Sequence, residues 1–158
     1  MGVGSLIPLK QYSEFIEILS LVKRFQPDVH AVLCGKGPEE SALKTLISQY
    51  DLQDHIVLTG ELPHDEVLEF MAKSKIFLHT SSFEGICISC LEALYAGSHV
   101  LSFVQLMNSP IEHWHILSTK EQMAEKIRNI LSSPSTEYRA VKTFTVRETV
   151  QTIIQLFS

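Results

Sequence analysis

The sequence predicts an α/β protein in which a parallel sheet of about five to six strands carries helices on both faces. Short apolar runs rich in β-branched and aromatic residues recur along the chain. Segments with apolar residues at helical spacing separate these runs. The chain has 158 residues and no linker-like stretch, so we expect one domain, 1–158. Alternation of this kind places the helices on both sides of one sheet, in three layers.

Five apolar runs are the expected strands, and each has only four to six residues. They are residues 2–6, 29–34, 56–59, 75–80 and 99–103. Strands covered on both faces are apolar along their whole length rather than on alternate residues. Residues 104–118 are the least regular part of the chain, and we interpret them as a loop over the functional site. Within them, His113, Trp114 and His115 are expected in a surface loop, with contact to a ligand or a neighbouring domain as the alternative.

The helices are expected between the strands. Their apolar stripes are Phe15, Ile18, Leu19, Val22 and Phe25; Leu43, Leu46, Ile47 and Tyr50; Val67, Phe70 and Met71; and Met123, Ile127, Ile130 and Leu131. Pro38 and Pro63 suit the starts of the second and third helices. A fourth helix is expected over residues 85–96, ended by Gly97 in a left-handed conformation. Thr119-x-x-Gln122 predicts a capping box for the fifth, and Thr145-x-x-Glu148 another in a helical tail at about 135–158.

Composition excludes several classes of protein. The charged fraction is 20% and the net charge is −5, with no basic block, so nucleic acid is not an expected partner. No apolar run reaches the roughly 18–20 residues that span a bilayer, and the first residues do not resemble a signal peptide. The three cysteines, Cys34, Cys87 and Cys90, are expected as free thiols in a reducing compartment, which favours the cytoplasm.

The most informative segment is residues 81–102, where a polar turn follows an apolar strand and leads into a helix. Glu84 and Glu92 lie eight positions apart, about two helical turns, so both could face one ligand. The amides of Cys87 and Ile88 open the helix, and such a terminus suits a phosphate. A plainer interpretation is also open: a Glu at a helix start complements the dipole, and the second Glu is solvated.

Two other motifs suggest chemistry. Cys87-x2-Cys90 could be a redox or zinc motif, with His79 and His99 as metal partners, but no second pair of ligands accompanies it. We therefore expect buried thiols and no metal. Gly35-Lys36-Gly37 begins like a dinucleotide or P-loop fingerprint, but Glu40 stands at the third glycine. A phosphate-facing glycine turn with a solvated Lys36 is the expectation that remains.

Four ordered segments resemble the donor-binding domain of GT-B glycosyltransferases, especially glycosyltransferase family 4. The string EGICISCLEALYAGSHV resembles the E-x7-E signature of that family. The other three are VLCGKGPEESALK, IVLTGELPHDEVLEFMAKSKIFLHTSSFEG and VGSLIPLK, in the order and at the spacing of the family. The resemblance covers residues 2–103 well and the remainder weakly. It implies one Rossmann-like half of a GT-B fold.

The resemblance also implies the roles of individual residues. Glu84 would lie beside the donor sugar as the catalytic residue, and Glu92 would bind the ribose hydroxyls. Lys10 would pair with the diphosphate, and the backbone at Leu62 would meet the base. The remaining donor-binding positions are Gly35, Gly85, Ile86, Cys87 and Ile88. The family retains anomeric configuration and uses neither a metal ion nor a cofactor beyond the nucleotide-diphospho-sugar substrate.

The chain departs from the family pattern at several positions. Ser5 stands where the family has an Arg, Gln11 where it has a Gly, and Cys87 where a Gly approaches phosphate. His99 replaces a Pro, and Glu112 is a poor match for a downstream Glu.

The N-terminal acceptor-binding half is absent from the sequence. Either the chain is an excised C-terminal domain or a separate polypeptide supplies that half, and alone we expect it to bind a nucleotide sugar weakly and to transfer little. Any peripheral membrane association would come through that half. Two alternatives remain: a degenerate nucleotide-sugar-binding or interaction module, and an unrelated Rossmann-type dehydrogenase.

Overall fold

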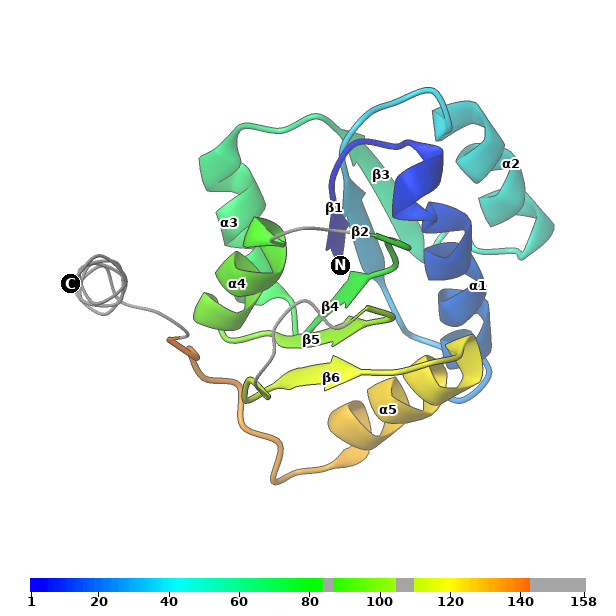
Figure 1. The fold of residues 1–158 in the computed structure, drawn as a ribbon. Coiled ribbons are helices and arrows are strands. Elements are labelled where there is room, and N and C mark those ends of the chain that lie inside the picture. The colour runs from blue at the N-terminus through cyan, green and yellow to red at the C-terminus, as the bar shows by residue number, and fades with distance from the viewer. Residues whose placement is uncertain (84–86, 105–109, 143–158) are drawn as a thin grey trace.

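The computed structural model describes residues 1–83, 87–104 and 110–142, which form alternating strands and helices (Figure 1). The strands are β1 (Gly2–Val3), β2 (Ala31–Cys34), β3 (Ile56–Gly60), β4 (Ile76–His79), β5 (His99–Ser102) and β6 (Trp114–Ile116). The helices are η1 (Pro8–Lys10), α1 (Tyr12–Lys23), α2 (Glu40–Gln49), α3 (His64–Lys73), α4 (Ile88–Tyr95) and α5 (Lys120–Ser132).

The strands pair in parallel in two groups of three, β1-β2-β3 and β4-β5-β6. Met1 joins the two groups. Its amino group donates to the carbonyl of Ile76 at 2.6 Å, and its carbonyl accepts from the amide of Leu78 at 2.8 Å. The strands therefore lie in the order β3-β2-β1-β4-β5-β6. Successive strands are added on one side of β1 up to β3 and on its other side from β4 onward, so the strand order switches between β1 and β4. Sheets of this order bind ligands beyond the carboxyl ends of the strands at that switch.

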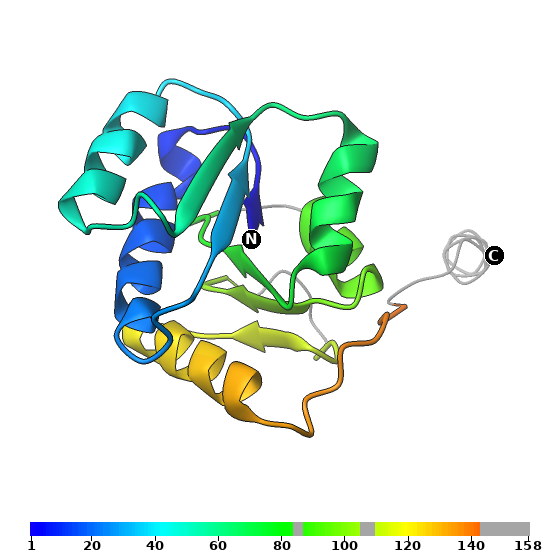
Figure 2. The ribbon, with the colours of Figure 1, turned by 180° about the vertical axis from the view of Figure 1, so that it is seen from behind.

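Helices cover both faces of the sheet, as the two opposite views show (Figure 1 and Figure 2). On one face α1, α2 and α5 enclose a core that includes Phe15, Leu33 and Met123. On the other face α3 and α4 enclose a second core that includes Phe77 and Cys90. The predicted α/β fold with helices on both faces is confirmed.

Several local signals act as the sequence predicts. The amide of Gln122 donates to the hydroxyl oxygen of Thr119 at 3.2 Å, and the Gln122 side chain accepts from the Ser118 amide, so α5 begins at its capping box. Gly97 has a φ of +97° and follows Ala96, the C-cap of α4. Pro63 precedes the first residue of α3.

Other expectations are corrected. Residues 114–116, placed in a loop by the sequence analysis, form β6, because a half-buried edge strand needs less continuous apolar sequence than a central one. Phe25 and Tyr50 were assigned to buried stripes but lie beyond the ends of α1 and α2, and both are exposed. Residues 135–142 carry no helix. The Thr145-x-x-Glu148 box lies outside the described residues.

No helix in the described ranges is both long enough and apolar enough to cross a membrane.

Candidate functional site

A pocket of about 310 Å³ lies beyond the carboxyl ends of β1, β2 and β3. Ser5, Gly35 and Leu62 line it together with the side chains of Cys34 and Val67. Gly35 and Leu62 come from loops that are far apart in sequence, and both were predicted to bind the donor. This edge of the sheet is where an α/β fold binds ligands, so we take the pocket as the centre of the candidate site.

The glycine turn after β2 is shaped by the backbone of the loop after β1. A Cβ on Gly35 would lie 1.9 Å from the carbonyl oxygen of Gly4, and one on Gly37 would lie 2.4 Å from the carbonyl oxygen of Leu6. The amide of Leu6 donates to the carbonyl of Lys36 at 3.0 Å. Packing of two backbones therefore accounts for both glycines, and the expectation of a phosphate-facing turn gains no support from their spacing.

Lys10 lies on the same edge of the sheet. Its side-chain stem passes Gly4, since a Cβ built on that glycine would be 3.5 Å from Cε of Lys10. The hydroxyl of Thr80 donates to the carbonyl of Lys10 at 2.8 Å, and that of Ser81 donates to the carbonyl of Leu9 at 3.1 Å. These bonds tie the Lys10 loop to the end of β4. Lys10 is thus held near the switch in strand order between β1 and β4.

The fourth helix begins one residue after Cys87. The side chain of Cys87 is 5% exposed and belongs to the core under α3 and α4, whereas that of Ile88 is 66% exposed. The side chain of Cys87 therefore turns inward, and its part in donor binding stays a prediction. Glu84, Gly85 and Ile86 lie outside the described residues.

Cys87 belongs to a cluster with Cys90 and His79, and all three side chains are buried. One ligand atom from each lies within 4.8 Å of the others. Hydrogen bonding from the Cys90 thiol lowers the pKa of Cys87 to about 4, with help from His79 and Ser89 and against the effect of burial. The prediction that Cys87 and Cys90 are buried, unbridged cysteines is confirmed.

Glu92 lies in the second turn of α4 and contacts the start of α3. Its Oε1 is 3.3 Å from Nε2 of His64, which follows Leu62 by two residues. Glu92 therefore lies beside the loop that lines the pocket, and one oxygen of its carboxylate already contacts His64. Lys36, expected to be solvated, is exposed but forms an ion pair with Glu61 at the rim of the pocket.

The histidines around His99 form a separate cluster away from this edge. His99 begins β5, so it lies at the amino end of the sheet, and its ring stacks on His113 with the centroids 4.2 Å apart. Nδ1 of His99 is 3.1 Å from Nε2 of His115. The strand position of His115 corrects the expectation of a surface loop. Because His99 and His79 lie at opposite ends of their strands, His99 is excluded as a partner of the two cysteines.

Glu112, the weakly matched downstream Glu, is engaged at the same end of the molecule. Its Oε1 accepts a hydrogen bond from Arg139 at 2.6 Å and lies 3.7 Å from His113. Both partners are far from the pocket beyond β1, β2 and β3.

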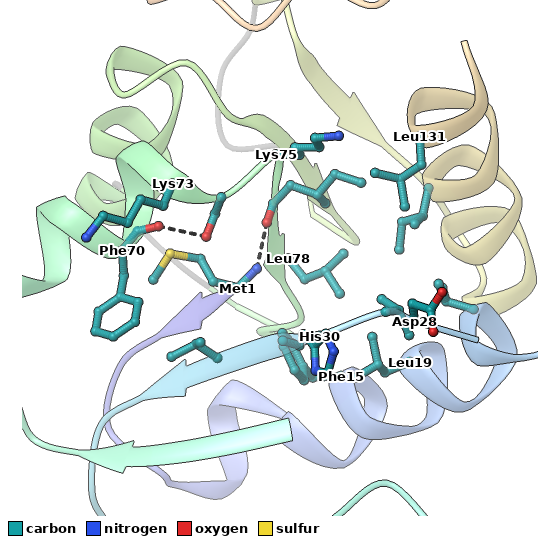
Figure 3. Close-up of a pocket in the computed structure, with 17 residues that line it drawn as sticks. Met1, Phe15, Leu19, Asp28, His30, Phe70, Lys73, Lys75, Leu78 and Leu131 are labelled. Atoms are coloured by element: carbon teal, nitrogen blue, oxygen red, sulfur yellow. Dashed lines mark hydrogen bonds between the residues drawn. The ribbon is translucent and has the colours of Figure 1, made fainter. Parts of the chain in front are cut away.

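A larger cavity of about 480 Å³ lies at the amino ends of the strands (Figure 3). Met1, Phe15, Phe70 and Leu78 are among its largely apolar lining residues. The amino ends are the wrong edge for a ligand in this class of sheet. The cavity is therefore not part of the candidate site.

Sequence reasoning missed two features of the site. The hydroxyls of Thr80 and Ser81 follow β4 directly, and a run of hydroxyl residues at a strand end is the signal that could have found them. His64 was overlooked because a single histidine at a helix start carries no pattern.

Comparisons with known proteins agree with this fold. The gpi3 component of the phosphatidylinositol N-acetylglucosaminyltransferase of Schizosaccharomyces pombe is 28% identical over 146 residues, which are 89% of this chain and 32% of that protein. The chain thus spans about a third of that relative's length. The fold is that of TarM of S. aureus, solved in complex with UDP, with a TM-score of 0.85 and 17% identity over 99% of this chain and 35% of that one.

A solved structure of similar extent exists as well. The C-terminal domain of a glycosyl transferase group 1 family protein, LpcC of Francisella tularensis, superposes with a TM-score of 0.75 and 19% identity. The match covers 99% of this chain and 85% of that one. Residues 2–144 match the family described as glycosyl transferases group 1. Because nine-tenths of its residues lie inside that match, the chain belongs to the group 1 glycosyltransferases.

Proposed function

We propose that this chain is the donor-binding, C-terminal domain of a family 4 glycosyltransferase, and that it holds a nucleotide-diphospho-sugar at the carboxyl edge of its sheet. The observation that carries the proposal is the position of Lys10, fastened by Thr80 beside the pocket that contains Ser5, Gly35 and Leu62. The UDP in the TarM complex and the N-acetylglucosaminyltransferase relative support a nucleotide sugar as the ligand.

Each part of the donor would meet a different part of the site. The base would lie against Leu62, and the ribose hydroxyls would displace His64 from the carboxylate of Glu92. The diphosphate would lie between Lys10 and the first-turn amides of α4. As the glycosidic bond breaks, negative charge grows on the departing diphosphate, and a cation and helix amides stabilise it.

The reaction we propose retains anomeric configuration and uses no metal on the leaving group, with Glu84 beside the sugar. A separate N-terminal acceptor-binding domain would complete the cleft, so this chain alone would transfer little. Any association with a membrane would come through that domain. The buried free cysteines fit a reducing, cytoplasmic compartment.

A second candidate is a module of the same fold that binds a nucleotide sugar, or a partner, without catalysis. Two observations favour it: Ser5 brings no charge to the diphosphate, and Glu92 is already in contact with His64. A dehydrogenase is disfavoured because Gly35 and Gly37 are explained by contact with the β1 loop.

Calorimetric titration of the chain with UDP, GDP and ADP, with their sugars and with NAD tests the proposal. We expect binding of one nucleoside diphosphate and its sugar at a single site, and none of NAD. Transfer by a protein that includes the acceptor domain separates an enzyme from a degenerate module. If no nucleoside diphosphate binds, the donor-domain proposal is wrong.

A further inference from the structure

The cluster of His79, Cys87 and Cys90 unites two elements that the core would otherwise join only by packing. His79 ends β4, Cys87 precedes α4, and Cys90 lies in the first turn of that helix. Two sulfurs and an imidazole nitrogen are the ligand set that zinc prefers. In the sequence, no second pair of ligands accompanies Cys87-x2-Cys90, and for that reason buried thiols were expected. The fold brings His79 to the two cysteines from the adjacent strand.

The geometry points to a zinc-binding site formed by Cys87 Sγ, Cys90 Sγ and one ring nitrogen of His79. The three ligand atoms already lie within 4.8 Å of one another. In a tetrahedral zinc site, bonds of about 2.3 Å to sulfur and 2.0 Å to nitrogen place neighbouring ligands roughly 3.5–3.8 Å apart. A contraction of about 1.3 Å at most therefore brings them to the metal, a change that side-chain rotation supplies.

The surroundings suit this ion. The side chains of all three ligands are buried in the core under α3 and α4, where few waters compete for the metal. Zinc binds both cysteines as thiolates and oxidises neither, so no redox partner is needed. Three protein ligands leave a fourth position for a water molecule. The metal would link the start of α4 to the end of β4. We assign it no part in sugar transfer.

A matched contrast exists within the chain. Cys34 is as buried as the other cysteines, but it lies in β2 and is not a member of the cluster. Replacement of Cys34 therefore separates a zinc site from the general effect of losing a buried thiol.

The test uses the whole chain, kept reduced, freed of metal by a chelator and titrated with zinc against a chromophoric competitor. We expect one zinc ion per chain and a rise in Tm with zinc. Cys90→Ser and His79→Gln should weaken zinc binding about 100-fold or more, because each removes a direct ligand. Cys34→Ser and His30→Gln should bind zinc as the unmodified chain does. Equal zinc binding by all variants would overturn the site.

A second measurement needs no variants. X-ray absorption at the zinc edge of the loaded chain should show two sulfur and two nitrogen or oxygen neighbours, and cobalt in its place should give sulfur-to-metal charge-transfer absorption. A shell of nitrogen and oxygen alone, or a Cys87–Cys90 disulfide that forms in place of metal binding, would show that the cluster is not a zinc site. Nucleotide titration of the same samples keeps this result separate from the proposed function, since zinc can bind whether or not a nucleotide does.

Discussion

The hydroxyl of Thr80 donates a hydrogen bond of 2.8 Å to the backbone carbonyl of Lys10, seventy residues earlier in the chain. This bond joins the loop after β1 to the end of β4, the two strands between which the strand order switches. A lysine on an unattached loop would lose side-chain and backbone freedom on binding phosphate. Lys10 has a fixed backbone before any ligand arrives, so less freedom remains to be lost.

We expect Lys10→Ala to weaken the binding of nucleoside diphosphates by about 1.5–3 kcal/mol, the range for a charge-assisted hydrogen bond. Binding of the free nucleoside should change little, because it lacks the diphosphate. Calorimetry at two salt concentrations checks this, since an open ion pair weakens with salt. Lys75→Ala, at the amino end of β4, is the matched control. Equal losses for nucleoside and diphosphate would place Lys10 outside the phosphate site.

Glu92→Ala should weaken nucleotide binding by about 1–3 kcal/mol through lost ribose hydrogen bonds. The melting temperature should barely change, because the contact with His64 is half exposed and exposed pairs add little stability. Glu69→Ala, on the exposed side of α3, serves as the control. A variant that binds normally but melts early would make Glu92 a structural residue.

Ser5→Arg should tighten nucleoside-diphosphate binding by about 1–2 kcal/mol, because Ser5 is exposed at the pocket and points no charge into it. The side chain of Cys87 turns into the core, so adding Cys87→Ala to Ser5→Arg should bring no further gain. Titration of the single and double variants measures both effects. A gain that appears only in the double variant would mean that Cys87 blocks the phosphate after all.

Gln11→Gly should stabilise the fold by about 0.5–1 kcal/mol. Gln11 has a φ of +49° between η1 and α1, a left-handed conformation that is unfavourable for a residue with a Cβ and free of that penalty for glycine. Urea unfolding measures the change. Gln53→Gly is the control and should be neutral or destabilising, because Gln53 is not among the described residues with positive φ. A loss of stability in Gln11→Gly would contradict this argument.

Acid should destabilise the protein through His115. Burial lowers the pKa of His115 to about 4 from an ordinary value of 6.5. Below pH 6.5 the unfolded chain therefore binds a proton at this histidine, whereas the folded chain does not. The contribution of His115 to the free energy of unfolding is thus full above pH 6.5 and falls toward pH 4. Because the ring is only partly buried, we expect a loss on the order of 1–2 kcal/mol.

Urea unfolding at pH 7 and pH 5 measures that loss. His115→Gln should flatten the dependence on pH, whereas His30→Gln, an exposed histidine, should leave it unchanged. Some slope should remain in His115→Gln, because burial also lowers the pKa of His99. An equal slope in the two variants would assign the acid sensitivity elsewhere.

Local sequence patterns predicted the central strands and the helices, because each has an apolar run or stripe of its own. The same patterns could not predict β6, whose residues Trp114 and His115 are half-buried and polar enough to resemble a loop. The inward turn of Cys87 and the meeting of His79 with the two cysteines depend on which strand lies next to α4. Such a neighbour relation follows from tertiary packing and has no signature in a short segment.

The candidate site shows the same division. The strand-to-helix turns that carry Ser5, Gly35 and Leu62 could be predicted, because parallel strands bring their carboxyl ends to one edge. The contact of Glu92 with His64 could not, since it depends on the angle between α3 and α4. The stem of Lys10 lies over Gly4 for a similar reason, the path of a loop held by Thr80.

The ion pairs of Lys120 have a consequence for how the chain reaches its native state. The Lys120 amine lies 3.2 Å from Glu14 and also pairs with Glu17, so α5 packs directly against α1. Phe15 and Leu19 share a core with Met123 and Ile127 of α5. At synthesis rates of about 5–20 residues per second, α5 would be synthesised on the order of ten seconds after α1, and until then the apolar stripe of α1 lacks its contacts with α5. Contacts this distant in sequence slow folding, and the emerging chain is most open to aggregation during that interval.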